Sequence, residues 1–174
     1  MATYLKKAEL HDLTAIMSII AEARQLLHDR QVPQWQNGEG PSEAILKKDI
    51  QLERCYVLIH EGVIAGLGVI SFESELPYES LRNGSWQANS FNSYAVLHRV
   101  ALGSAFQGKG LAALLMNHLL TAARLTKHFD IRIDTHPKNQ AMQRLVKNIG
   151  FSYQGEILLP VPDGERLAYQ LILT

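Results

Sequence analysis

The sequence H-R-V-A-L-G-S-A-F-Q-G-K-G-L-A-A-L-L, residues 98–115, says most about the fold. Its first part belongs to a β-rich run from Tyr94 to Leu102, and its last part begins an amphipathic helix that extends to about Thr126. Three glycines punctuate the loop between strand and helix: Gly103, Gly108 and Gly110. Glycine lets the backbone reach positive φ, so that N–H groups converge at the positive end of a helix dipole. The segment predicts a binding site for a phosphate group.

On both sides of this segment, apolar residues recur at spacings typical of alternating helices and strands. The patterns predict helices at about 13–27, 42–52, 108–126 and 137–149, and strands at 3–8, 55–60, 63–72, 94–102, 129–135, from 151, and in a last hairpin through 167–173. A polar connection is expected over 73–93. The order βααβββαβαββ predicts an α/β fold in a single domain, residues 1–174. We expect a mixed, largely antiparallel twisted sheet of about seven strands, flanked by about four helices.

Composition excludes several classes of protein. The 174 residues are 47% apolar and 20% charged, which is typical of a single globular domain. Seventeen Lys plus Arg balance seventeen Asp plus Glu, so we expect no nucleic-acid partner. No apolar run is long enough to span a membrane, and Cys55, the only cysteine, cannot form an internal disulfide. A single cysteine fits a reducing compartment, so we expect a cytoplasmic protein. The histidines lack metal-ligand spacing, so we expect no metal site.

Two kinds of phosphate-binding loop fit the glycine pattern. The string G-S-A-F-Q-G-K-G, which begins at Gly103, nearly completes the Walker A motif of nucleotide-binding P-loop proteins. Gly110, however, stands where that motif needs a Ser or Thr hydroxyl to coordinate magnesium. The P-loop interpretation is therefore the less favoured alternative.

The second kind of loop matches better. Gln107, Gly110 and Ala112 fit the Q/R-x-x-G-x-G/A signature of the GNAT superfamily of N-acetyltransferases. The segment N-Q-A-M-Q-R-L-V-K-N-I-G-F, residues 139–151, resembles the second motif of that family, and the order of elements is also similar. The resemblance implies transfer of an acetyl group from acetyl-CoA to a primary amine by direct attack. The acceptor would be a small molecule or a protein N-terminus, and a homodimer is possible in this family.

The resemblance also implies which residues bind acetyl-CoA. The backbone of Val100 and Leu102 would meet the pantetheine arm, and Asn139 would lie beside the cofactor. The pyrophosphate would be held by six consecutive residues: Gln107, Gly108, Lys109, Gly110, Leu111 and Ala112. For Asn139 the alternative role is capping of the following helix, which is compatible with cofactor contact.

Three residues are candidates for the proton transfers of the reaction. His98 is the first candidate for the base, because imidazole titrates near neutral pH and the residue lies on the strand that enters the loop. Glu73, at the end of the preceding strand, is the second. Val146 occupies the place of the tyrosine that protonates the coenzyme A thiolate in many family members, and Tyr153 is the candidate substitute. Without an acid, a non-catalytic sensor or binding module for acyl-CoA is the alternative function.

Recognition of the acceptor is predicted from aromatic and acidic side chains. Trp35 and four further aromatic residues would line a pocket, and three glutamates would attract a cationic amine: Tyr78, Trp86, Phe91 and Tyr94, with Glu73, Glu75 and Glu79. The other interpretation of these residues is packing and solubility.

Overall fold

The computed structural model describes residues 2–174, in which seven strands form one sheet in the order β1-β2-β3-β4-β5-β7-β6. The strands are β1 (Thr3–Lys7), β2 (Cys55–His60), β3 (Val63–Ser71), β4 (Tyr94–Leu102), β5 (Asp130–Thr135), β6 (Ser152–Leu158) and β7 (Glu165–Ile172). The pair β4–β5 is parallel, and all other neighbouring strands are antiparallel. The predicted α/β fold with a mixed, largely antiparallel sheet is confirmed.

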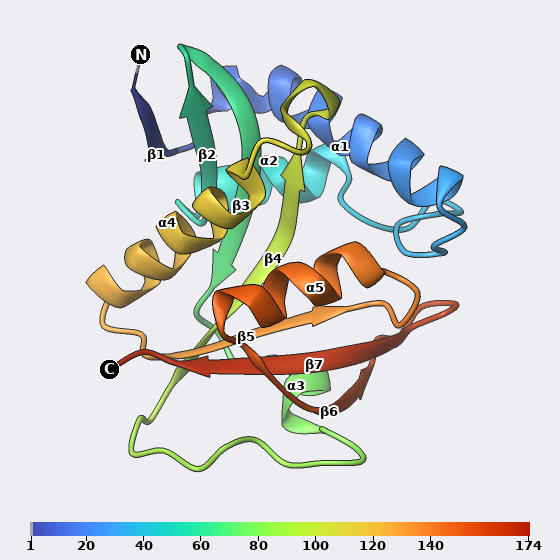
Figure 1. Ribbon diagram of the computed structural model, residues 1–174, viewed down its shortest axis with the longest axis vertical. Helices are drawn as coiled ribbons and strands as arrows, with labels where there is room; N and C mark the ends of the chain where they lie inside the picture. The colour runs from blue at the N-terminus through green and yellow to red at the C-terminus, as the bar shows by residue number, and fades with distance from the viewer. Residues whose placement is uncertain (1) are drawn as a thin grey trace.

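Helices cover both faces of the sheet (Figure 1). The four predicted helices are α1 (Leu13–Asp29), α2 (Glu43–Gln51), α4 (Leu111–Leu125) and α5 (Gln140–Ile149). A fifth helix, α3 (Leu76–Glu79), lies in the stretch that the sequence predicts as a polar connection. Its four residues are too few to show a helical period, although Pro77 in the first turn is a helix-start signal. Two short 3₁₀ turns complete the chain, η1 (Leu10–Asp12) and η2 (Ser104–Phe106).

The ends of the helices follow local sequence signals. Ser42 caps α2, since its side chain accepts a hydrogen bond from the Ile45 N–H at 3.2 Å. Gly150 ends α5 with φ 115°, in the left-handed conformation that glycine adopts without strain. The expected start of α5 at Pro137 is three residues early, because Asn139 is the N-cap and the helix begins at Gln140.

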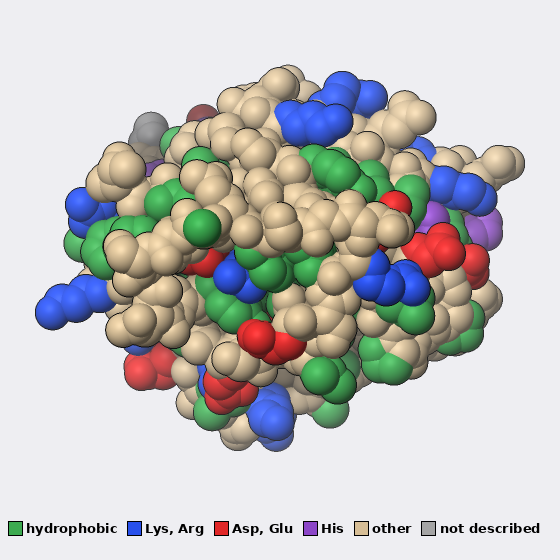
Figure 2. Space-filling view, turned by 90° about the horizontal axis from the view of Figure 1, so that it is seen from below, with side chains coloured by type: hydrophobic (Ala, Val, Ile, Leu, Met, Phe, Trp, Pro, Cys, Tyr) green, Lys and Arg blue, Asp and Glu red, His purple; other side chains and the backbone are tan. Residues whose placement is uncertain are grey.

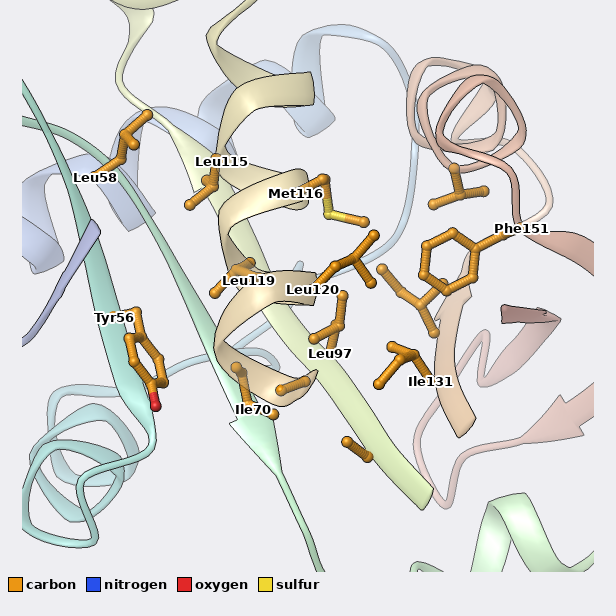
Figure 3. Close-up of a cluster of buried hydrophobic side chains, with 14 of the residues drawn as sticks. Tyr56, Leu58, Ile70, Leu97, Leu115, Met116, Leu119, Leu120, Ile131 and Phe151 are labelled. Atoms are coloured by element: carbon orange, nitrogen blue, oxygen red, sulfur yellow. The ribbon is translucent and has the colours of Figure 1, made fainter. Parts of the chain in front are cut away.

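The larger part of the core lies between the sheet and the helices α4 and α5. Figure 3 shows Leu115, Leu119 and Leu120 of α4 pointing toward the strands, with Phe151 at the far side of the cluster. At Gly68 of β3 a Cβ atom would lie 2.5 Å from Leu119 Cδ1, so the absent side chain lets α4 approach the sheet. A second buried cluster lies under α1 and α2 on the opposite face.

A bulge in β4 decides where the sheet opens. Val69 pairs with His98 and Leu67 pairs with Ala101, so two residues of β4 oppose Gly68 of β3. Arg99, in this bulge, has φ 53°. The pairing of β4 with β5 covers only Tyr94–Leu97 against Asp130–Ile133. Beyond Leu97 the two parallel strands separate, as Figure 1 shows.

Membrane-spanning helices, metal-ligand clusters and surface charge were considered for the described part of the chain. Residues 2–174 contain no helix that is long and apolar enough to cross a bilayer. They also contain no group of three or more His, Cys, Asp or Glu side chains that could hold a metal ion. On the face in Figure 2, basic and acidic side chains are interspersed rather than gathered into a continuous basic surface.

Candidate active site

A cavity of about 480 Å³ lies where β4 and β5 separate. Ala112, Met142 and Leu145, on one side of it, pack against the core cluster under α4 and α5. Trp35 and Ala23, on the other side, pack against the cluster under α1 and α2. The cavity therefore reaches both faces of the sheet through the gap between the two strands.

The loop before α4 presents unpaired backbone N–H groups. Gly108 and Gly110 have φ 72° and 75°, and Gly110 is the N-cap of α4 without a side-chain capping bond. Within residues 2–174, the N–H groups of Gly108, Lys109 and Gly110 have no hydrogen-bond partner. The N–H groups of the first turn of α4 have none inside the helix either. A Cβ at either glycine would meet nothing within 4 Å, so this surface is open to an anion.

Three side chains of the loop make contacts within the protein. Gln107 lines the cavity and donates a hydrogen bond from Nε2 to the Leu102 carbonyl at 3.3 Å. Lys109 Nζ lies 5.8 Å from the centre of the Phe106 ring. Leu111 is buried in the core, so only its backbone is available to a ligand in the loop.

The splayed part of β4 lines the cavity with Val100 and Leu102. Beyond Leu97 the edge of β4 that faces β5 has no strand partner, so its backbone groups can bond a ligand. Asn139 lines the cavity from the start of α5. Its Oδ1 accepts from the Met142 N–H at 3.2 Å, and its Nδ2 donates to Gln34 Oε1 at 3.3 Å. Asn139 thus caps the helix and also borders the cavity.

His98 is the one of the three predicted proton-transfer residues that lines the cavity. Its Nε2 lies 2.7 Å from Glu75 Oε1, and both side chains are about three-quarters buried. Burial, the largest single influence, acts to raise the pKa of Glu75, but the hydrogen bond and charge of His98, together with Ser71 and Arg99, leave that pKa below its usual range. His98 Nδ1 has no hydrogen-bond partner within residues 2–174.

The two other candidates lie elsewhere. Glu73 is exposed, does not line the cavity, and accepts a hydrogen bond from Arg54 Nη2 at 2.5 Å. That hydrogen bond lowers the pKa of Glu73. Tyr153 is 47% exposed on β6 and packs its ring edge-to-face against Tyr169, with centroids 5.9 Å apart. Val146 is fully buried in the core and does not line the cavity.

Of the predicted aromatic residues, only Trp35 lines the cavity. Its carbonyl accepts a hydrogen bond from Arg24 Nε at 3.0 Å, which ties the loop before α2 to α1. A Cβ at Gly40 would lie 2.8 Å from Trp35 Cβ, so this glycine makes room for the indole side chain. The remaining aromatic residues pack in stacked layers instead: Tyr78 with Trp86 and Tyr94, and Phe91 with Phe129.

Several residues at the cavity are absent from the sequence prediction. Asp134 and Arg166 lie on its wall, with Asp134 Oδ2 3.7 Å from Arg166 Nε. Thr135 also lines it, and its hydroxyl is buried without a partner. Their only sequence signal is a position at the end of a strand, and many strand ends carry polar residues without a role. Glu75 was predicted only as one of three glutamates that attract an amine. It lies two residues beyond Glu73, and nothing in the local sequence shows which of the two carboxylates contacts His98.

Comparison with known proteins supplies the relatives of this chain. The family model of the acetyltransferase (GNAT) family matches residues 22–151. The crystal structure of a GNAT-family acetyltransferase from Streptococcus agalactiae is 31% identical, covers 99% of this chain and 96% of its own, and has a TM-score of 0.90. No curated protein matches the chain.

Two more distant structures share the fold. The protein yncA of Salmonella typhimurium, solved with its cofactor acetyl-CoA, is 19% identical over 100% of this chain and 95% of its own, with a TM-score of 0.70. The ribosomal-protein-S18-alanine N-acetyltransferase of Escherichia coli is 18% identical, covers 99% of this chain and 95% of its own, and has a TM-score of 0.66.

Proposed function

Because the chain belongs to the GNAT family of acetyltransferases, we propose that it moves an acetyl group from acetyl-CoA to a primary amine on a small molecule or a protein N-terminus. One observation carries the proposal. The cavity between β4 and β5 is lined by Gln107 and Ala112, on either side of the open loop, and also by His98, whose Nδ1 has no partner among residues 2–174. Enzymes of this family use acetyl-CoA, and yncA, which shares the fold, was solved with it.

The cofactor would lie along the gap between the strands. Its pyrophosphate would accept hydrogen bonds from the backbone of residues 107–112, where the helix dipole of α4 adds positive potential. The unpaired edge of β4 at Val100 and Leu102 would bond the pantetheine amides, and Asn139 would border the arm from α5. The acetyl group would then reach the part of the cavity wall that contains His98.

The reaction requires a neutral amine, because the nitrogen lone pair attacks the thioester carbonyl carbon. His98 Nδ1 takes one proton from the ammonium form of the acceptor. The C–N bond then forms and the C–S bond breaks, and coenzyme A leaves as a thiolate. The nitrogen gives up its second proton to solvent. A thiol with a pKa near 8.5 is a good leaving group near neutral pH, so this sequence needs no side-chain acid at Val146.

Release of coenzyme A, followed with a thiol reagent, tests the proposal on a panel of small amines and peptides with free N-termini. We expect turnover with at least one class. His98→Ala should lower kcat by about a hundredfold and leave the Kd for acetyl-CoA unchanged, because a positioned base contributes on that scale. His28→Ala, at an exposed position on α1, is the matched control and should keep full activity.

Two outcomes would contradict the proposal. Tight binding of acetyl-CoA without turnover on any amine would favour the alternative of an acyl-CoA sensor. An unchanged rate in His98→Ala would remove this histidine from the reaction.

A further inference from the structure

We infer that Glu75 is a positioning residue, which holds the His98 imidazole with its proton on Nε2 and its lone pair on Nδ1, ready to take the proton of the acceptor amine. The inference rests on the proposed function, because it assigns a role within the same site. On sequence alone, Glu75 is only one of three glutamates before β4 and has no separate role.

The contact itself is short and shielded. Glu75 Oε1 and His98 Nε2 are 2.7 Å apart, with the two side chains 26% and 24% exposed. A hydrogen bond to an ionised carboxylate is about twice as strong as a neutral one, and shielding from water strengthens it further. This pair therefore restrains rotation of the imidazole ring.

The ionisation of Glu75 decides which ring nitrogen carries the proton. The pKa of Glu75 lies below its usual range, so the side chain is a carboxylate near neutral pH. A carboxylate only accepts hydrogen bonds, so Nε2 of the neutral imidazole must be the donor. The lone pair is then on Nδ1, the atom without a partner in residues 2–174, on a residue of the cavity wall.

Glu75 is held in place from two directions. Its backbone N–H donates to the Tyr94 hydroxyl at 3.0 Å, and that hydroxyl donates to Glu79 at 2.8 Å. The imidazole itself packs edge-to-face against the ring of Tyr78, with centroids 6.4 Å apart. The Tyr78 hydroxyl donates to Asp134 Oδ1 at 2.6 Å, which ties α3 to β5. The pair thus has a rigid frame from α3, β4 and β5.

Glu79 accepts its hydrogen bond from the Tyr94 hydroxyl, and the remaining charged groups near the pair have partners of opposite charge. They come from α2, β4, β5, β7 and the adjoining loops, and form three ion pairs: Asp49 with Arg99 at 3.4 Å, Glu73 with Arg54 at 2.5 Å, and Asp134 with Arg166 at 3.7 Å. Burial raises the pKa of Tyr78 well above its usual value, so this phenol stays neutral. Glu75 is consequently the carboxylate whose partner is His98 itself, and it stabilises the imidazolium that forms when Nδ1 takes a proton.

The first test is Glu75→Gln, which keeps the shape but removes the charge. We expect kcat to fall by about a hundredfold while KM for acetyl-CoA and for the amine stays unchanged. The acid limb of the kcat/KM profile should move to lower pH by about one unit, because the imidazolium has lost its anionic partner. Glu61→Gln, at an exposed position in the turn between β2 and β3, is the matched control and should leave the profile unchanged. Glu75→Asp should restore the position of the acid limb even if the rate stays low.

A second test does not depend on turnover. In the ¹⁵N spectrum of the imidazole side chains, neutral His98 should be protonated on Nε2, and Glu75→Gln should populate the Nδ1-protonated form. A wild-type imidazole protonated mainly on Nδ1 would overturn the inference. So would Glu75→Gln with full activity and an unmoved acid limb, or a further large loss when Glu75→Gln is added to His98→Ala. Absence of turnover in the wild type, with the expected spectrum, would count against the proposed function alone.

Discussion

Individual polar side chains on the cavity wall differ in whether their hydrogen-bonding atoms have partners. Gln34 Oε1 accepts from the His136 N–H at 3.4 Å and from Asn139 Nδ2 at 3.3 Å. The hydroxyl of Thr135, by contrast, has no partner among the described residues, and the side chain is only 1% exposed. A buried hydroxyl without a partner costs about 1 to 3 kcal/mol. Thr135 is therefore a position where the folded protein gives up stability.

Replacement of this hydroxyl by a methyl group should stabilise the free protein. Thr135→Val keeps the shape and removes the unpaired polar atom, so we expect the free energy of unfolding to rise by about 1 kcal/mol. Thr135→Ser keeps the hydroxyl and loses a buried methyl group, so it should lower that free energy by about 1 kcal/mol. Urea unfolding of both variants without ligand measures the difference. A less stable Thr135→Val would show that the hydroxyl has a partner in solution, such as water in the cavity.

Among the elements, the loop before α4 and the hairpin between β2 and β3 contain glycines with the same backbone conformation. Gly110 has φ 75° and Gly62 has φ 82°, and a Cβ at either position would meet nothing within 4 Å. An L-residue in this region costs about 1 kcal/mol or more. The two sites thus carry the same local strain, but only Gly110 faces the predicted pyrophosphate.

Alanine at these two positions separates strain from binding. Gly110→Ala and Gly62→Ala should destabilise the free protein equally, by about 1 kcal/mol each. Only Gly110→Ala should weaken acetyl-CoA binding, because in the proposed complex its methyl group would crowd the pyrophosphate; we expect a tenfold or larger rise in Kd by calorimetric titration. Equal affinity for acetyl-CoA in the two variants would rule out the loop as the pyrophosphate site.

Across the chain as a whole, the sheet consists of two parts joined at one short contact. Four residue pairs connect β4 to β5, and beyond them the cavity separates the strands. Gln34 closes part of the gap, since it ties the loop before α2 to the end of β5. A ligand in this gap touches both parts and stabilises the folded state by its binding free energy.

Thermal unfolding with and without ligand tests this consequence. At about a hundredfold excess over its Kd, acetyl-CoA should stabilise the protein by about 2.7 kcal/mol, which raises Tm by about 5 to 11 °C for a chain of this size. Magnesium ATP at the same concentration should leave Tm unchanged. A shift with magnesium ATP and none with acetyl-CoA would favour the P-loop interpretation of residues 103–110.

Local sequence patterns determined most of the elements and the backbone conformation of the loop before α4. The strands β2 and β4 begin and end where their apolar runs do, and Ser42 and Gly150, residue types favoured at these positions, cap their helices. The loop from Gly108 to Gly110 was also readable, because positive φ and a helix N-terminus depend only on neighbouring residues. The short helix α3 could not be predicted from the sequence, because four residues are too few to show the periodic spacing of apolar residues in a helix.

Tertiary structure alone decided which groups meet at the cavity. The bulge at Arg99 depends on the register of β4 against β3, and that register moves every later side chain to the other face of the sheet. Glu73 and Glu75 are chemically equivalent in the sequence, yet the chain turns so that Glu73 reaches Arg54 and Glu75 reaches His98, 23 residues away. Contacts over such separations come from the packing of whole elements, which is why the sequence singled out His98 as the candidate base but did not show which carboxylate lies beside it.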